Sequence, residues 1–155
     1  MGFGAEERLH NATLKETVYS RRHDSGLSVY FCPKPAYRKR YACFATHFGS
    51  IDSRFRVSNG DVIELPEGVA HFLEHKLFEG EEGNAFERFS QSGAASNAYT
   101  SFTVTNYLFS CGVDFHKNLQ LLIDFVREPY FTDENVEKEK GIIGQEIRKI
   151  GRAHV

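Results

Sequence analysis

The segment Gly68–Phe78, with the sequence GVAHFLEHKLF, carries two histidines and a glutamate at a spacing that suits metal chemistry. His71, Glu74 and His75 lie within five consecutive positions. If the segment is a helix, residues four apart are neighbours on one face, with Cβ atoms about 5–6 Å apart. The two imidazoles can then bind one zinc ion through bonds of roughly 2.0–2.1 Å, and Glu74 borders the same face as a candidate general base for hydrolysis.

The same pattern also fits an ordinary helix surface, because histidine and glutamate three or four positions apart often form solvated pairs. A hydrolytic zinc site needs a third protein ligand from another part of the chain. Glu139 and Glu146, in the predicted helix ENVEKEKGIIGQEIRK, are candidates that lie seven positions apart on nearly the same face. Two turns separate them by about 10.5 Å along the axis, too far for both to bind one ion. The spacing does not decide which of the two is the ligand.

The elements that must position these residues follow from turn formers, capping residues and hydrophobic periodicity. Helices are expected from Pro66 to about Phe78, over 85–91 and 115–127, and from 133, after an N-cap at Thr132, to about 150. Strands are expected at 18–19 and 27–32, joined by a turn at 24–26, then at 41–48 and as a hairpin within 96–111, with a loop at 51–64. This order predicts an α+β domain with a mostly antiparallel sheet packed against helices.

Composition narrows the class of protein. At 155 residues, with 41% apolar and 26% charged residues, the chain is expected to form one globular domain. A formal net charge of -2 gives no reason to expect a nucleic-acid partner. No apolar run approaches the length of a membrane span, and the N-terminus lacks the layout of a signal peptide. Cys32, Cys43 and Cys111 are therefore expected to be buried free thiols in a cytoplasmic protein.

Several segments together resemble a known peptidase family. The stretch His71–His75 reads His-x-x-Glu-His, the inverted form of the zinc-peptidase motif. It stands in one chain with PEGVAHFLEHKLFE, ASNAYTSFT, EPYFT and EKEKGIIGQEI. In this combination the chain resembles the insulinase/pitrilysin family of zinc metallopeptidases, and most closely its half-length bacterial members, which are similar to the mitochondrial processing peptidase. The resemblance covers about residues 20–149.

The resemblance implies a role for each candidate side chain. His71, His75 and Glu146 would bind one Zn²⁺ ion, and Glu74 would be the general base. Glu139 would support the site through hydrogen bonding. The implied activity is that of a zinc-dependent endopeptidase acting on extended, unstructured peptides. A non-catalytic binding or scaffold subunit of a family heterodimer is the alternative.

The resemblance also implies a place for the peptide substrate. Asn97, Ala98, Tyr99 and Thr100 match the edge strand along which such enzymes pair an extended peptide through its main chain. The residues themselves leave open an ordinary core hairpin, because β-branched and aromatic residues favour strands in any setting.

The family also sets an expectation for the extent of the chain. Its members are longer, and a second, similar domain contributes an arginine and a tyrosine to the site. Residues 1–149 would then be a truncated N-terminal zinc peptidase domain, poorly active or inactive without that domain or a sister subunit. Residues 150–155, IGRAHV, do not continue the family pattern and can be encoded along a common sequencing adapter. We therefore expect a non-native tail, in which His154 is not a ligand.

Overall fold

The computed structural model describes residues 2–81 and 83–152, and the chain divides into two compact units, Met1–Arg38 and Lys39–Val155. The first unit is an antiparallel sheet in the order β1-β2-β3. Its strands are β1 (Glu7–Asn11), β2 (Glu16–Arg22) and β3 (Ser28–Phe31). The predicted hairpin between β2 and β3 is present. β1 is not predicted from the sequence, because its residues, ERLHN, are nearly all polar, and all five are exposed.

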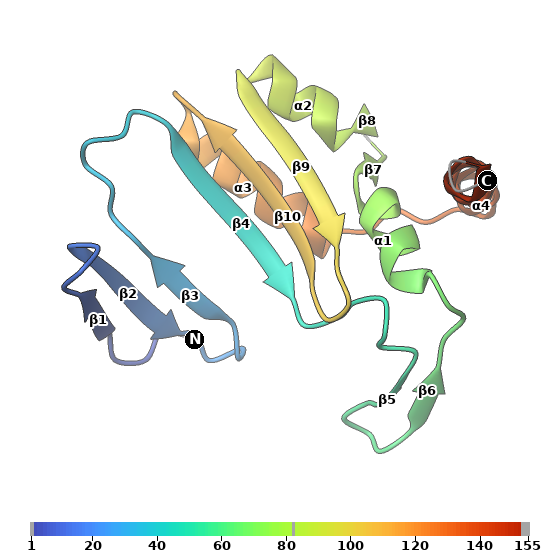
Figure 1. Ribbon diagram of the computed structural model, residues 1–155, viewed down its shortest axis with the longest axis horizontal. Helices are drawn as coiled ribbons and strands as arrows, with labels where there is room; N and C mark the ends of the chain where they lie inside the picture. The colour runs from blue at the N-terminus through green and yellow to red at the C-terminus, as the bar shows by residue number, and fades with distance from the viewer. Residues whose placement is uncertain (1, 82, 153–155) are drawn as a thin grey trace. The chain divides into compact units, whose positions relative to one another are not determined.

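The second unit is built on an antiparallel sheet in the order β4-β10-β9 (Figure 1). Its strands are β4 (Arg40–Thr46), β9 (Ala94–Thr100) and β10 (Thr105–Cys111). The predicted strand at 41–48 and the hairpin within 96–111 are thereby confirmed, as is the α+β class. β10 is the central, largely buried strand, and β9 is an edge strand of the sheet.

The segment 51–64 is not the loop that the sequence predicts. It contains an antiparallel hairpin of β5 (Arg54–Arg56) and β6 (Val62–Glu64). The turn between them includes Asn59–Gly60, a dipeptide typical of tight hairpins, and Gly60 has a φ of 95°. Glycine adopts this conformation without a steric penalty, so the turn signal outweighs the mixed polarity of the segment.

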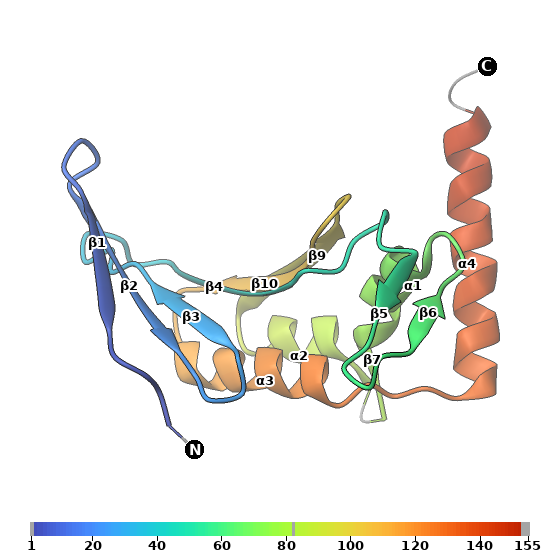
Figure 2. The same ribbon diagram turned by 90° about the horizontal axis from the view of Figure 1, so that it is seen from below.

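The helices of the second unit are α1 (Val69–Leu77), α2 (Ala85–Gln91), α3 (Phe115–Arg127) and α4 (Asp133–Arg152). α2 and α3 cover one face of the β4-β10-β9 sheet, as Figure 2 shows from below. α1 contacts β9 and β10 on one side and α4 on the other. A short hairpin of β7 (Glu79–Gly80) and β8 (Gly83–Asn84) joins α1 to α2. Within the part of the chain that the structure describes, no helix is both long and apolar enough to span a membrane.

α1 begins three residues later than the sequence predicts. Gly68, its N-cap, has a φ of 86°, a left-handed conformation that a continuous right-handed helix from Pro66 cannot contain. The first helical hydrogen bond runs from the Phe72 N–H to the Gly68 carbonyl, at 2.9 Å. Val69 is therefore the first helical residue, and the histidines lie in the first and second turns of α1.

α4 begins where the sequence predicts. The Thr132 hydroxyl accepts a hydrogen bond from the Asn135 N–H at 3.2 Å, and the Asn135 side chain accepts one from the Thr132 N–H at 2.9 Å. This reciprocal capping satisfies two backbone donors that the helix leaves unpaired. At the other end, α4 continues to Arg152, and residues 153–155 of the predicted tail lie outside the described residues. The boundary of the domain at residue 149 stays a prediction.

A cluster of buried aromatic and aliphatic side chains from the sheet and the helices that cover it stabilises the second unit. Phe89 of α2 and Phe109 of β10 are fully buried, with ring centroids 5.6 Å apart. Full burial of a side chain of this size contributes about 1.5–3 kcal/mol to folding. Phe78, which follows α1, packs against Phe125 with ring centroids 5.0 Å apart. The core thereby holds the end of α1 beside the sheet.

The cysteines are all free, but they differ in exposure. Cys111 is buried as predicted, whereas the prediction is wrong for Cys43, which is exposed, and Cys32 is half-buried. Ala42 and Phe44 of β4 pack against the core. Because side chains alternate along a strand, Cys43 lies on the opposite face.

Candidate metal centre

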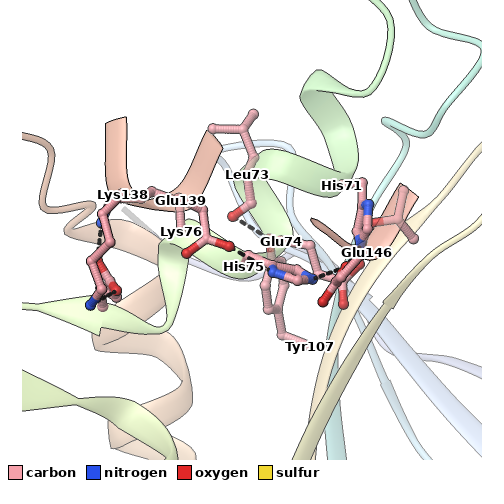
Figure 3. A network of polar contacts seen from close by, with 11 residues as sticks. His71, Leu73, Glu74, His75, Lys76, Tyr107, Lys138, Glu139 and Glu146 are labelled. Carbon is pink, nitrogen blue, oxygen red and sulfur yellow. Dashed lines mark hydrogen bonds and ion pairs between the residues drawn. The ribbon is translucent and has the colours of Figure 1, made fainter. Parts of the chain in front are cut away.

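α1 places the two histidines of the motif side by side. The ring centroids of His71 and His75 lie 4.5 Å apart, and the ring planes are nearly perpendicular, at 86° (Figure 3). Both side chains are half-buried. One helical turn between them brings the two rings together without distortion of the backbone.

α4 brings a carboxylate to this pair. The Oε2 atom of Glu146 lies 3.9 Å from the Nε2 atom of His71 and 3.9 Å from the Nε2 atom of His75. Among the described residues, these three are the group whose possible ligand atoms all lie within 4.8 Å of one another. Ligands of one tetrahedral zinc, at bonds of roughly 2.0–2.2 Å, are separated by about 3–4 Å. Two imidazoles and a carboxylate at these distances therefore fit a zinc ion and would supply three of its ligands.

Glu139, two turns earlier on α4, has a different neighbour. Its Oε1 atom accepts a hydrogen bond of 2.8 Å from Nδ1 of His75, and the residue is only 4% exposed. Donation from Nδ1 leaves Nε2 of His75 with a lone pair, directed toward Glu146 (Figure 3). Histidines that bind metals commonly donate their other N–H to a carboxylate in this way. In the structure, Glu139 and Glu146 therefore have different surroundings, a difference that their spacing in the sequence does not reveal.

Glu74 lies on α1 between the two histidines and contacts the sheet. Its Oε2 atom accepts a hydrogen bond of 2.6 Å from the Thr100 hydroxyl at the end of β9. The Tyr107 hydroxyl, on β10, donates to the Leu73 carbonyl at 3.4 Å. Burial, and to a smaller extent the negative charge of Glu74, raises the pKa of Tyr107 well above its usual value. This phenol therefore stays protonated at neutral pH.

The four residues predicted to bind peptide lie on β9, but they do not share one environment. Asn97 and Tyr99 are exposed, and Ala98 and Thr100 are half-buried. The Asn97 side chain accepts a hydrogen bond of 2.9 Å from the Ala98 N–H. In the described part of the chain, β9 pairs with β10 on one side and with no strand on the other.

The contact between Thr100 and Glu74 is not predicted from the sequence, which places Thr100 only on the peptide-binding strand. The one signal was the alternation of side chains along 96–100, which puts Thr100 on the same face as Ser96 and Ala98. That pattern identifies a face of the strand, but it does not show that α1 lies against that face.

The chain is similar to a known protein family and to several of its members. The family described as Insulinase (Peptidase family M16) matches residues 54–155. A Bacillus subtilis protein named as the uncharacterized zinc protease YmfH is 54% identical over 135 residues, which are 86% of this chain and 32% of that protein. A crystal structure of an Alicyclobacillus acidocaldarius protein described as M16-like is 48% identical, with a TM-score of 0.82 over 87% of this chain and 32% of that one.

A more distant structure, that of pitrilysin, is 19% identical and shares the fold, with a TM-score of 0.70 over 92% of this chain and 15% of its own. The chain thus spans about a third of the length of the two more similar relatives, at 32% in each case.

Proposed function

The chain belongs to the insulinase family of peptidases, M16, and from this membership and the geometry of the site we propose that it is the metal-binding part of a zinc-dependent endopeptidase. The observation that carries the proposal is the convergence of His71, His75 and Glu146, whose possible ligand atoms lie within 4.8 Å of one another. A single Zn²⁺ ion bound there would polarise the scissile carbonyl and promote ionisation of a water at neutral pH.

Glu74 is the residue that we assign to proton transfer in this reaction. Its carboxylate accepts a proton from the water as the water oxygen attacks the scissile carbonyl carbon. It then returns the proton to the amine nitrogen as the C–N bond breaks. The Thr100 hydroxyl, 2.6 Å from Oε2, fixes the orientation of the carboxylate at the end of β9. The hydrogen bond from Nδ1 of His75 to Glu139 fixes the orientation of that imidazole ring.

The position of β9 at the edge of its sheet supports an extended peptide as the substrate. An extended peptide can add to such a strand through main-chain hydrogen bonds, which give affinity with little demand on sequence. The Ala98 N–H is hydrogen-bonded to the side chain of Asn97, its own neighbour, and a peptide carbonyl can replace that partner. Because the relatives are about three times as long, a further domain or a sister subunit would enclose the peptide from the other side.

Metal binding by the chain is the direct test of this proposal. Dialysis of the 155-residue chain against Zn²⁺, followed by elemental analysis, should give one ion per chain. We use the term full-length protein for this chain together with the further domain or sister subunit proposed above. The full-length protein should cleave an unstructured peptide, lose this activity on chelation and regain it when Zn²⁺ is restored. A chain that folds and binds no zinc, or cleavage that survives complete removal of metal, would contradict the proposal.

Replacing Thr100 with valine should lower kcat of the full-length protein about tenfold and leave KM nearly unchanged. The substitution keeps the shape of the side chain but removes the hydrogen bond to Glu74, and one such bond to a charged group contributes about 1.5 kcal/mol. Steady-state kinetics on an unstructured peptide measure the effect, and Thr100→Ser is the control that keeps the hydroxyl. A rise in KM at constant kcat would instead show that Thr100 binds the substrate.

A further inference from the structure

Lys76 is a buried cation that the proposed chemistry does not use. It follows His75 in α1, and it is 0% exposed. Its Nζ atom donates a hydrogen bond to Oε2 of Glu79, the first residue of β7. Burial of an ammonium group costs several kcal/mol unless an anion compensates it, so this pairing explains how the charge is tolerated.

Glu79 also contacts α4. Its second oxygen, Oε1, lies 3.5 Å from the Nζ atom of Lys138. The hydrogen bond from Lys76 lowers the pKa of Glu79, with a smaller effect from Lys138, so the carboxylate is ionised at neutral pH. One carboxylate therefore joins a buried lysine of α1 to a lysine of α4. We call these three residues the charge bridge.

The contacts between the two helices follow a regular order. Lys138 contacts Glu79, and the next residue, Glu139, contacts His75. The Oε2 atom of Glu146 lies 3.9 Å from the Nε2 atoms of both His71 and His75. As the chain advances along α4, its contacts thus move back from the end of α1 toward its start. Figure 3 shows the same order, with Lys76, Lys138 and Glu139 on one side of His75 and His71 and Glu146 on the other.

We propose that the charge bridge of Lys76, Glu79 and Lys138 is a positioning device for the metal centre. It fixes the approach of α4 to α1 and so sets where Glu146 meets the two imidazoles. Glu146 lies about 12 Å along the helix axis from Lys138, so a small tilt at the bridge becomes a larger displacement of the carboxylate. The inference rests on the proposed metal centre, because the quantity that it controls is metal affinity.

The test uses Co²⁺ as the probe, since its visible absorption reports both affinity and coordination geometry. Lys138→Met removes the contact with Glu79 and leaves the pair of Lys76 and Glu79 intact. The double variant Lys76→Met with Glu79→Gln removes the buried ammonium group and its half-buried carboxylate partner together, which avoids the uncompensated charge that a single replacement leaves. Each should raise the Co²⁺ dissociation constant about tenfold and alter the absorption spectrum, as expected for partners outside the ligand set.

Two controls make the test specific. Lys140→Met removes a lysine of α4 whose partner, Glu137, lies 2.5 Å away on the same exposed helix surface, and it should bind Co²⁺ as the unmodified chain does. Lys138→Arg keeps the charge and should restore the affinity. Circular dichroism and urea unfolding of each variant separate loss of metal from loss of fold.

The possible results are distinguishable. If the unmodified chain binds Co²⁺ and both bridge variants bind it equally well, the charge bridge has no positioning role. The inference is also overturned if the variants bind Co²⁺ less tightly only in proportion to a lower midpoint of urea unfolding, and if the Co²⁺ absorption spectrum is unchanged. If the unmodified chain binds no Co²⁺, the proposed metal centre itself is wrong, and the inference falls with it.

Discussion

Replacing Glu74 with glutamine is expected to lower kcat/KM for peptide cleavage by about 10²–10⁴-fold and to leave metal affinity unchanged. Glutamine has the same shape, and its amide oxygen can still accept the hydrogen bond of the Thr100 hydroxyl. It cannot accept a proton from water, so the variant removes only the base. Glu74 is not one of the three residues whose possible ligand atoms converge, so the metal site keeps its donors.

Two measurements check this expectation. Kinetics of the full-length variant on an unstructured peptide give the loss of activity, and a Co²⁺ titration gives the metal affinity. Glu67→Gln, at an exposed position just before α1, is the matched control and should change neither quantity. Retained cleavage would show that Glu74 is not the base, and lost metal would show that it is a ligand. Either result would require a different mechanism.

The local features of the site could be predicted because they depend on residues close in sequence. The pairing of His71 with His75 needs only a helix, and the capping of α4 needs only Thr132 and Asn135. The predicted start of α1 at Pro66 is wrong, because Gly68 has a left-handed conformation that a helix beginning at Pro66 cannot contain. Each of these features depends only on residues that are close together in the sequence.

The contacts between elements could not be derived in this way. The periodicity of α4 puts Glu139 and Glu146 on one face, but it does not show that α1 lies against that face 64 residues away in sequence. The resemblance to the family, and not the spacing, selected Glu146 as the ligand. Lys76 shows the same limit, because a lysine beside a polar motif suggests a solvated surface, whereas tertiary packing buries it completely.

The assignment of the two glutamates leads to the second large effect. Replacing Glu146 with glutamine is expected to weaken Co²⁺ binding by more than about 100-fold, because it removes the only anionic donor among the three proposed ligands. Replacing Glu139 with glutamine should weaken binding by about 10–100-fold, the range for partners that orient a ligand. The amide oxygen of the new side chain can still accept the hydrogen bond from Nδ1 of His75, so the imidazole keeps much of its orientation.

A direct comparison of these two variants separates a ligand from its support. Both carry the same change of chemistry on the same helix, and Glu137→Gln, at an exposed position two residues before Glu139, is the control for the charge of α4. Co²⁺ dissociation constants from absorption titrations, with unfolding curves for each variant, give the ranking. A larger loss for Glu139 than for Glu146 would exchange their roles. Equal and small losses would mean that neither carboxylate binds the ion. A catalytic zinc site has three protein ligands, so the third would then have to come from another residue.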